Sequence, residues 1–206
     1  NEIKPEEIKN GTIQLFIKQP VKHSRACMSL NVDPKDSIGY SFVKIVPDYG
    51  QPTFYANYCP AQQIMQFGKD GFMINFHDVP SVVYTEGEKI RTEGKDDWDV
   101  VLTYYITPEQ AYKAIEYAKN YNKPFNIVHN NCISFALDIF RHIGIPEELI
   151  YIKPHNWTVP EDIEQACREK GLPVDAIKAL LVNGFCPADA VEDLREANSS
   201  LVQFRR

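Results

Sequence analysis

Cys132 is the residue of this chain best suited to covalent chemistry, because it stands where a helix is expected to begin. The segment runs Asn130-Asn131-Cys132-Ile133-Ser134-Phe135-Ala136, and apolar residues then recur at helical spacing until Gly144 and Pro146 mark the end. A thiol at a helix N-terminus faces free backbone N–H groups, which favour its thiolate. The thiolate is the nucleophile of a cysteine hydrolase. The alternative is a buried structural cysteine, since free cysteine is among the most buried residue types.

A nucleophilic cysteine needs a base, and His23 is the strongest candidate among the five histidines. It opens an alternating stretch that predicts a half-buried strand over residues 24–32. A histidine at a strand end can hold its imidazole against a helix N-terminus. His129 lies in the turn just before Cys132 and could not easily reach back over the helix start, and His142 is typical of a helix end. The alternative for His23 is a surface histidine at a strand end.

The elements around these residues predict an α+β domain. Thr107-Pro108-Glu109-Gln110 combines an N-cap, a proline at the first helical position and a capping-box glutamine, so it predicts a helix start. Residues 47–98 are rich in Pro, Gly, Asn and aromatic residues, which either wall a substrate groove or anchor loops in the core. The aromatic residues concerned are Tyr49, Phe54, Tyr55, Tyr58 and Phe67. Strands are predicted at residues 12–17, 24–32, 38–46, 71–76, 81–85 and 100–106.

The pattern changes after Pro146. Proline and glycine punctuate three short amphipathic stretches between residues 158 and 197, which predict a small helical bundle. We therefore divide the chain into a domain over residues 1–150 and a C-terminal helical extension over residues 151–206. The extension either completes the core of the domain or docks on a delivery or other partner protein.

Composition excludes several classes of function. The formal net charge of −6 argues against a nucleic-acid partner, which is usually bound through a basic patch. No apolar run is long enough for a transmembrane segment, and the N-terminal residues do not resemble a signal peptide. Five scattered cysteines do not indicate a disulfide framework. His129-x-x-Cys132 lacks the second pair that a zinc site needs, so we expect neither a metal nor an organic cofactor.

The order of the elements, with histidine before cysteine, resembles the permuted branch of the NlpC-type, papain-fold cysteine hydrolases. The resemblance covers residues 12–146 and depends mainly on the strand from His23 and on the Asn-Asn-Cys-x-x-Phe-Ala signature. It implies a permuted papain-like fold, in which an antiparallel sheet packs against the helix that carries Cys132. His23 would be the base, although Lys22 stands where the family often has glycine.

The resemblance also suggests the remaining site residues. The family's third polar residue, which orients the imidazole, falls by position on the next strand, where Ser41 is our choice and Tyr40 the alternative. The oxyanion hole would use the backbone N–H of Cys132 and one further donor. Asn131 is the candidate for that donor, with a plain helix cap as its alternative role.

The branch that the chain resembles best contains amidases and endopeptidases that cut the stem peptides of peptidoglycan. Some of them are antibacterial toxins that type VI secretion systems deliver to the periplasm of a target cell, so an immunity or delivery protein is an expected partner. The same Cys signature occurs in lecithin:retinol acyltransferase-like lipid enzymes and PPPDE-type isopeptidases. A lipid or thioester acyl hydrolase, an acyltransferase or an isopeptidase is therefore the alternative. A non-catalytic binding module with a relic site is the third possibility.

Overall fold

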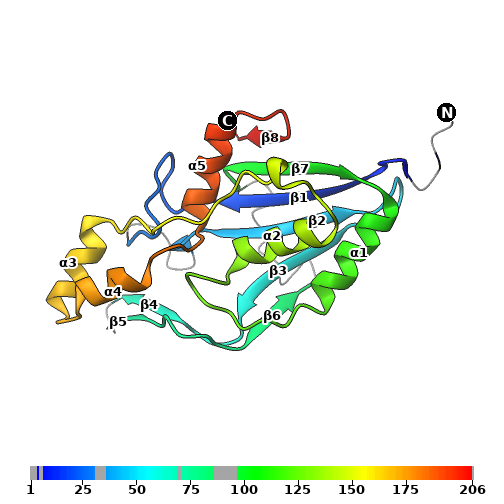
Figure 1. The fold of residues 1–206 in the computed structure, drawn as a ribbon. Coiled ribbons are helices and arrows are strands. Elements are labelled where there is room, and N and C mark those ends of the chain that lie inside the picture. Colours follow the sequence, from blue (N-terminus) through cyan, green and yellow to red (C-terminus); the bar gives the residue numbers. More distant parts are fainter. Residues whose placement is uncertain (1–3, 5–6, 31–35, 69–70, 86–96, 206) are drawn as a thin grey trace.

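An antiparallel sheet forms the centre of the molecule (Figure 1). The computed structural model describes residues 4, 7–30, 36–68, 71–85 and 97–205. Within these residues six strands pair in the order β6-β3-β2-β1-β7-β8, and every neighbouring pair is antiparallel. The strands are β1 (Gly11–Lys18), β2 (Tyr40–Val46), β3 (Phe54–Pro60), β6 (Ser81–Tyr84), β7 (Val100–Ile106) and β8 (Val202–Phe204). A separate hairpin pairs β4 (Met65–Gly68) with β5 (Gly71–Ile74).

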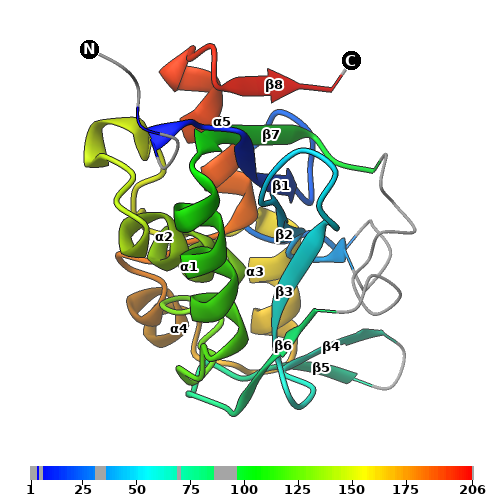
Figure 2. The same cartoon turned by 90° about the vertical axis from the view of Figure 1, so that its right-hand side faces the viewer.

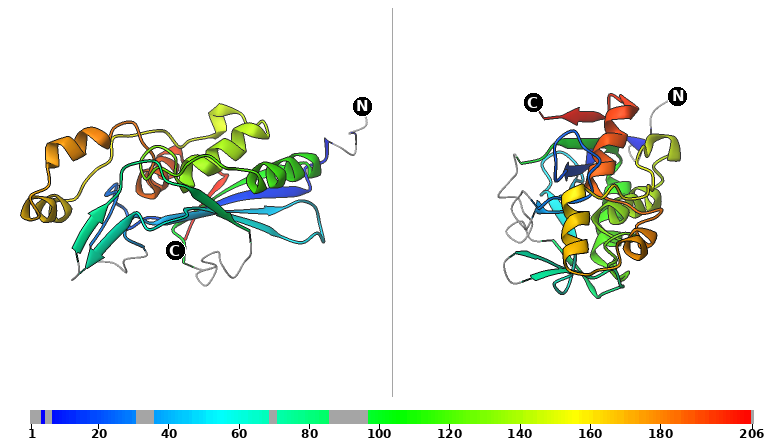
Figure 3. Two further views of the ribbon diagram at one scale, coloured as in Figure 1. Left: turned by 90° about the horizontal axis from the view of Figure 1, so that it is seen from below. Right: turned by 90° about the vertical axis from the view of Figure 1, so that its left-hand side faces the viewer.

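The helices cover one face of this sheet. Side chains alternate between the two faces of a strand, and in β1 the face towards the helices carries Ile13, Leu15 and Ile17, all fully buried. Figures 2 and 3 show α1, α2 and α5 on that face. The helices are α1 (Pro108–Lys119), α2 (Cys132–His142), α3 (Glu161–Glu169), α4 (Val174–Leu180) and α5 (Pro187–Ala197), with a 3-10 turn at Glu147–Leu149. None of the helices in the described segments is long and apolar enough to cross a membrane.

These elements confirm the predicted α+β class and the packing of an antiparallel sheet against the helix that carries the cysteine. Five of the six predicted strands are present, as β1, β2, β5, β6 and β7. The capping box at the start of α1 is also confirmed, because Thr107 Oγ1 accepts from the Gln110 N–H and Gln110 Oε1 accepts from the Thr107 N–H.

The predicted strand over residues 24–32 is wrong. Residues 24–30 make only an isolated bridge between Ala26 and Thr158, and residues 31–32 lie outside the described segments. The chain instead turns after β1, where His23 has a φ of 60° and donates its backbone N–H to Gln19 Oε1. The amide of Gln19 also binds the Ser24 carbonyl, so a side chain takes the place of a neighbouring strand.

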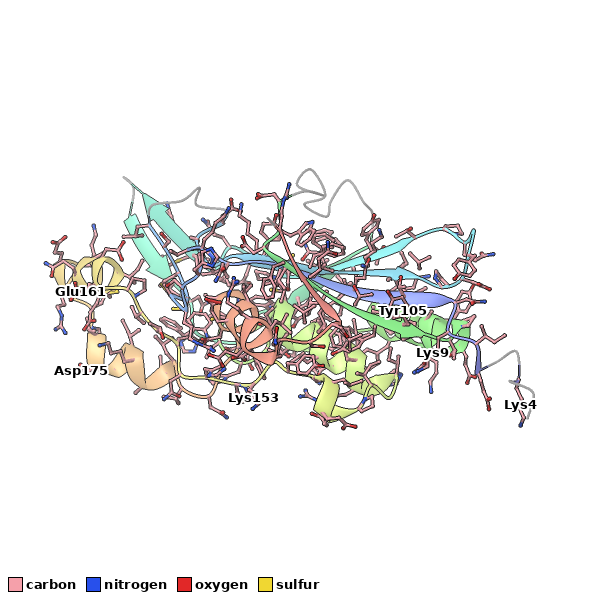
Figure 4. All side chains as sticks on the ribbon, turned by 90° about the horizontal axis from the view of Figure 1, so that it is seen from above. Lys4, Lys9, Tyr105, Lys153, Glu161 and Asp175 are labelled. Carbon is pink, nitrogen blue, oxygen red and sulfur yellow. The ribbon has the colours of Figure 1, made fainter. Side chains whose placement is uncertain are left out.

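The predicted C-terminal bundle of three helices is wrong in its third member. Helices α3 and α4 contact each other, but α5 packs on β1 and β7. Four small or aliphatic side chains of α5 are fully buried there: Ala188, Ala190, Val191 and Leu194. Strand β8 then pairs with β7, so the C-terminal residues complete the sheet and its core. In Figure 4, Glu161 and Asp175 mark α3 and α4 at the end of the molecule opposite to Lys4.

Candidate functional site

Cys132 lines a cavity of about 290 Å³ at one end of the sheet. The cavity lies where the N-terminus of α2 meets the start of β2 and the end of β3. Its walls are mainly apolar, with Ile38, Tyr58, Ile64, Phe125, Trp157 and Pro187 among them. The polar lining residues are Ser41, Asn57, Gln62, Gln63 and Asn131. A small, mostly apolar cavity with a few polar groups is typical of a ligand site.

A tight turn sets the position at which α2 begins. Asn126 Oδ1 accepts from the backbone N–H groups of Val128 and His129, and the backbones of Asn126 and Asn130 form an antiparallel bridge. The Asn126 amide donates to the Phe76 carbonyl and to Asp78 Oδ1, which ties the turn to the loop after β5. The backbone before Cys132 is therefore held from both sides.

Asn130 links the turn before α2 to Tyr58, a residue of the cavity wall. Its side-chain amide donates to the hydroxyl of Tyr58, which in turn donates to the Lys123 carbonyl at 2.6 Å. The ring of Tyr58 stacks on Phe135 of α2, with 5.3 Å between the ring centroids. One aromatic side chain of β3 thus fixes both the turn and the helix that carry the thiol.

Asn131 is the N-cap of α2. Its Oδ1 accepts from the Ile133 N–H, and Ser134 Oγ accepts from the Asn131 N–H. Both hydrogens of its amide are also used, by the carbonyls of Ile127 and Phe185 at 2.9 and 2.7 Å. The amide therefore has no donor left for an oxyanion, and the structure supports the capping role of Asn131.

Ser41, in β2, lines the cavity together with Cys132. Gly39, two residues earlier, has a φ of 74°, and a Cβ there would lie 2.2 Å from the Lys18 carbonyl oxygen and 3.0 Å from Pro187. Only glycine tolerates both the conformation and this close approach. This close packing fixes the path of the chain just before Ser41.

The environment of Cys132 acts on its thiol in two opposite directions. Burial raises the pKa of the thiol above its ordinary value and is the largest effect. The hydroxyl and the backbone N–H of Ser41, with the N–H groups of Cys132 and Ile133, lower the pKa but do not cancel the effect of burial. The residue is half-buried and lines the cavity, and because the pKa of its thiol is raised, the thiol is mostly protonated at neutral pH.

The structure does not bring His23 into this cavity. His23 is exposed in the turn after β1, and none of the described residues that line the cavity is a histidine. His77 and His129 are exposed, and His142 stacks on Tyr117 at the end of α2, 4.2 Å between centroids. His155 binds Asp193. The pairing of His23 with Cys132 stays a prediction.

The predicted aromatic residues of the middle segment have different surroundings, and Tyr49 takes neither of the two predicted roles. Tyr58 lines the cavity, while Tyr49 is 82 % exposed and Phe54 and Tyr55 are half-buried away from it. The side chain of Phe67 lies outside the described part. Among the described side chains, no group of three His, Cys, Asp or Glu residues is placed to hold a metal ion.

A second polar cluster lies beside the cavity, at the start of α5. Arg25 binds Asp189 at 2.9 Å and Asp193 at 3.0 Å, and both carboxylates are almost fully buried. His155 Nε2 lies 2.8 Å from Asp193 Oδ1, and Cys186 Sγ lies 3.3 Å from Asp189 Oδ2. We call these five residues the Arg25 cluster. Its side chains bind one another.

Several residues that position the site were missed from the sequence. Asn126 and Asn130 carried a signal, because asparagines before a helix commonly cap turns. Phe185 and Trp157 carried none: the Phe185 carbonyl accepts from both Asn131 and the indole of Trp157, contacts across more than 25 residues of chain. They require Gly184, where a Cβ would lie 2.3 Å from Val128.

No family model matches the chain, and neither a curated protein nor a solved structure is significantly similar to it.

Proposed function

We propose that the protein is a cysteine hydrolase of permuted papain-like fold that forms an acyl-enzyme on Cys132. The observation that carries the proposal is the position of Cys132, a half-buried residue at the first turn of α2 that lines an apolar cavity. The helix start offers backbone N–H groups to a developing negative charge, and the apolar walls exclude water from the reacting carbonyl.

Thioesters and activated esters are the substrates that this geometry supports best. An amide releases an amine, which must be protonated as it leaves, and in cysteine hydrolases a histidine supplies that proton. No described lining residue is a histidine. A thioester releases a thiolate whose conjugate acid has a pKa of about 8.5, so it can leave without a general acid.

An acyl transfer to Cys132 needs no cofactor, because every bond and proton is accounted for by the substrate, the thiol and water. The Cys132 sulfur adds to the carbonyl carbon, and the bond to the leaving sulfur breaks. The proton lost by the Cys132 thiol ends, through solvent, on the departing thiolate. Water then hydrolyses the new thioester and frees the carboxylic acid. The apolar walls favour an acyl group without charge, and the volume of about 290 Å³ favours a small one.

Peptidoglycan stem peptides are the second candidate. Asn57, Gln62 and Gln63 line the cavity with side-chain amides, and both glutamines are exposed at its rim. Amides of this kind can hydrogen-bond the backbone of a bound peptide. Cleavage of a peptide bond would additionally require His23, or another proton donor, to reach the cavity.

The test is acyl transfer from N-acetylcysteamine thioesters of four-, eight- and sixteen-carbon acids, followed by mass spectrometry of the intact protein and its peptides. We expect an adduct on Cys132 with the two shorter chains, and none in Cys132→Ala. Cys167→Ala is the matched control, because Cys167 lies in α3 and does not line the cavity.

Purified peptidoglycan forms the second arm of the same experiment. Fragments released by the wild type and not by Cys132→Ala would replace the thioester proposal with the stem-peptide one. No adduct and no fragments, from a protein that still folds, would overturn the hydrolase proposal altogether.

A further inference from the structure

The hydroxyl of Ser41 is an unusual polar group in this molecule. Ser41 is 2 % exposed, and its Oγ has no hydrogen-bond partner within the part of the chain that the structure describes. It lies beside the Cys132 sulfur, where it lowers the pKa of the thiol. Buried hydroxyls are normally paired, because an unpaired one loses its hydrogen bonds to water.

The position of this hydroxyl indicates what it pairs with. Ser41 lines the same cavity as Cys132 and acts on its thiol, so a carbonyl group that binds at the sulfur would meet Ser41. The other candidate donor, the amide of Asn131, is fully used by the carbonyls of Ile127 and Phe185. Of these two side chains, Ser41 is therefore the one with a donor left for a substrate oxygen.

From this geometry we infer that Ser41 Oγ donates a hydrogen bond to the substrate carbonyl oxygen and stabilises the oxyanion formed when Cys132 attacks. The sulfur–carbon bond forms, the electron pair of the carbonyl π bond moves to the oxygen, and that oxygen accepts from Ser41 and from the Cys132 N–H. The pair returns as the leaving thiolate departs. The inference rests on the proposed acyl transfer and gives Ser41 a role other than orienting an imidazole.

The first variant is Ser41→Ala, with two rates measured on each protein. Acyl transfer from an eight-carbon thioester passes through an oxyanion, whereas alkylation of Cys132 by iodoacetamide does not. One oxyanion donor typically contributes about 100-fold or more to the rate. We expect Ser41→Ala to lower the acylation rate about 100-fold. The alkylation rate should fall by much less, because alkylation senses only the lost effect of Ser41 on the pKa of the thiol.

Ser37→Ala is the matched control. Ser37 is 1 % exposed, its hydroxyl is also unpaired among the described residues, but it does not line the cavity. Both alanine variants remove a buried unpaired hydroxyl, so both should keep or raise the thermal midpoint. We expect only Ser41→Ala to lose acylation.

The possible outcomes distinguish the role of Ser41 from the proposed acyl transfer itself. A wild type that acylates, with Ser41→Ala equally fast, overturns the role of Ser41 alone. Equal losses of acylation and alkylation in Ser41→Ala also overturn it, because Ser41 would then act on the thiol and not on the oxyanion. A wild type that is not acylated by any thioester overturns the proposed function itself.

Discussion

Two cysteines of this protein stand at helix starts, yet their surroundings differ completely. Cys132 is the first residue of α2, and Cys186 is the N-cap of α5. The two helix starts are neighbours, because the Phe185 carbonyl accepts from the amide of Asn131. Both thiols thus meet the end of a helix dipole within one small region.

Burial and partners separate the two. Cys186 is fully buried, its sulfur accepts from the Asp189 N–H, and its thiol faces the carboxylate of the same residue. Burial, followed by the Asp189 charge, raises the pKa of Cys186 well above its ordinary value. Cys132 instead faces a cavity and an unpaired hydroxyl. A helix N-terminus is therefore not sufficient to make a nucleophile, and the groups across from the sulfur decide its role.

The Arg25 cluster includes Cys186, and removing Arg25 from it should have the largest effect of all the substitutions, on the stability of the protein. Arg25→Gln leaves Asp189 and Asp193 buried, with side-chain exposures of 3 % and 5 %, without their cation. We expect the free energy of unfolding in urea to fall by about 3 kcal/mol. Alkylation of Cys186 should speed up, because local opening becomes easier.

The control for this variant is Glu196→Gln. Glu196 binds the same guanidinium but is 74 % exposed, so its loss should cost less than about 1 kcal/mol. Equal effects of the two substitutions would show that the buried carboxylates do not depend on Arg25.

The accessibility of the two thiols gives the second prediction. Under native conditions iodoacetamide should modify Cys132 at least about 100-fold faster than Cys186, since only Cys132 opens to a cavity. Peptide mapping by mass spectrometry over time measures both rates. Comparable rates would mean that the cavity is closed to small molecules in solution.

The third prediction concerns how the rate of Cys132 alkylation depends on pH. Because the pKa of Cys132 is raised, the thiolate is scarce at neutral pH, and the alkylation rate should rise about tenfold per pH unit to beyond pH 8.5. A plateau below that pH would indicate that a cation lowers the pKa of Cys132 in solution.

The smallest expected effect is that of His23→Ala. Because His23 is exposed and does not line the cavity, the variant should lower the acylation rate on Cys132 less than about threefold. Single-turnover acylation with the eight-carbon thioester measures it. A loss of about 100-fold or more would instead support the dyad that the sequence predicts, since a general base contributes about that much.

The sequence predicted the elements that depend on local patterns. The alternation of β1 and the capping box of Thr107 and Gln110 were read correctly, because neighbours along the chain satisfy them. The alternation after His23 was misleading, since Gln19 and Thr158 bind that backbone in place of a strand. Helix α5 likewise showed an apolar face, but not that a sheet and not a bundle would cover it.

The same distinction between local patterns and long-range packing applies to the candidate site. By itself the sequence placed Cys132 at the start of a helix and Ser41 on a strand, because propensity and periodicity act over a few residues. Only the tertiary structure decided that Ser41 meets the thiol, that Asn131 is fully occupied, and that His23 lies outside the cavity. Those outcomes depend on the approach of β2, α2 and the residues around Phe185, which lie far apart in the chain. Long-range packing sets such contacts, and no local pattern encodes them.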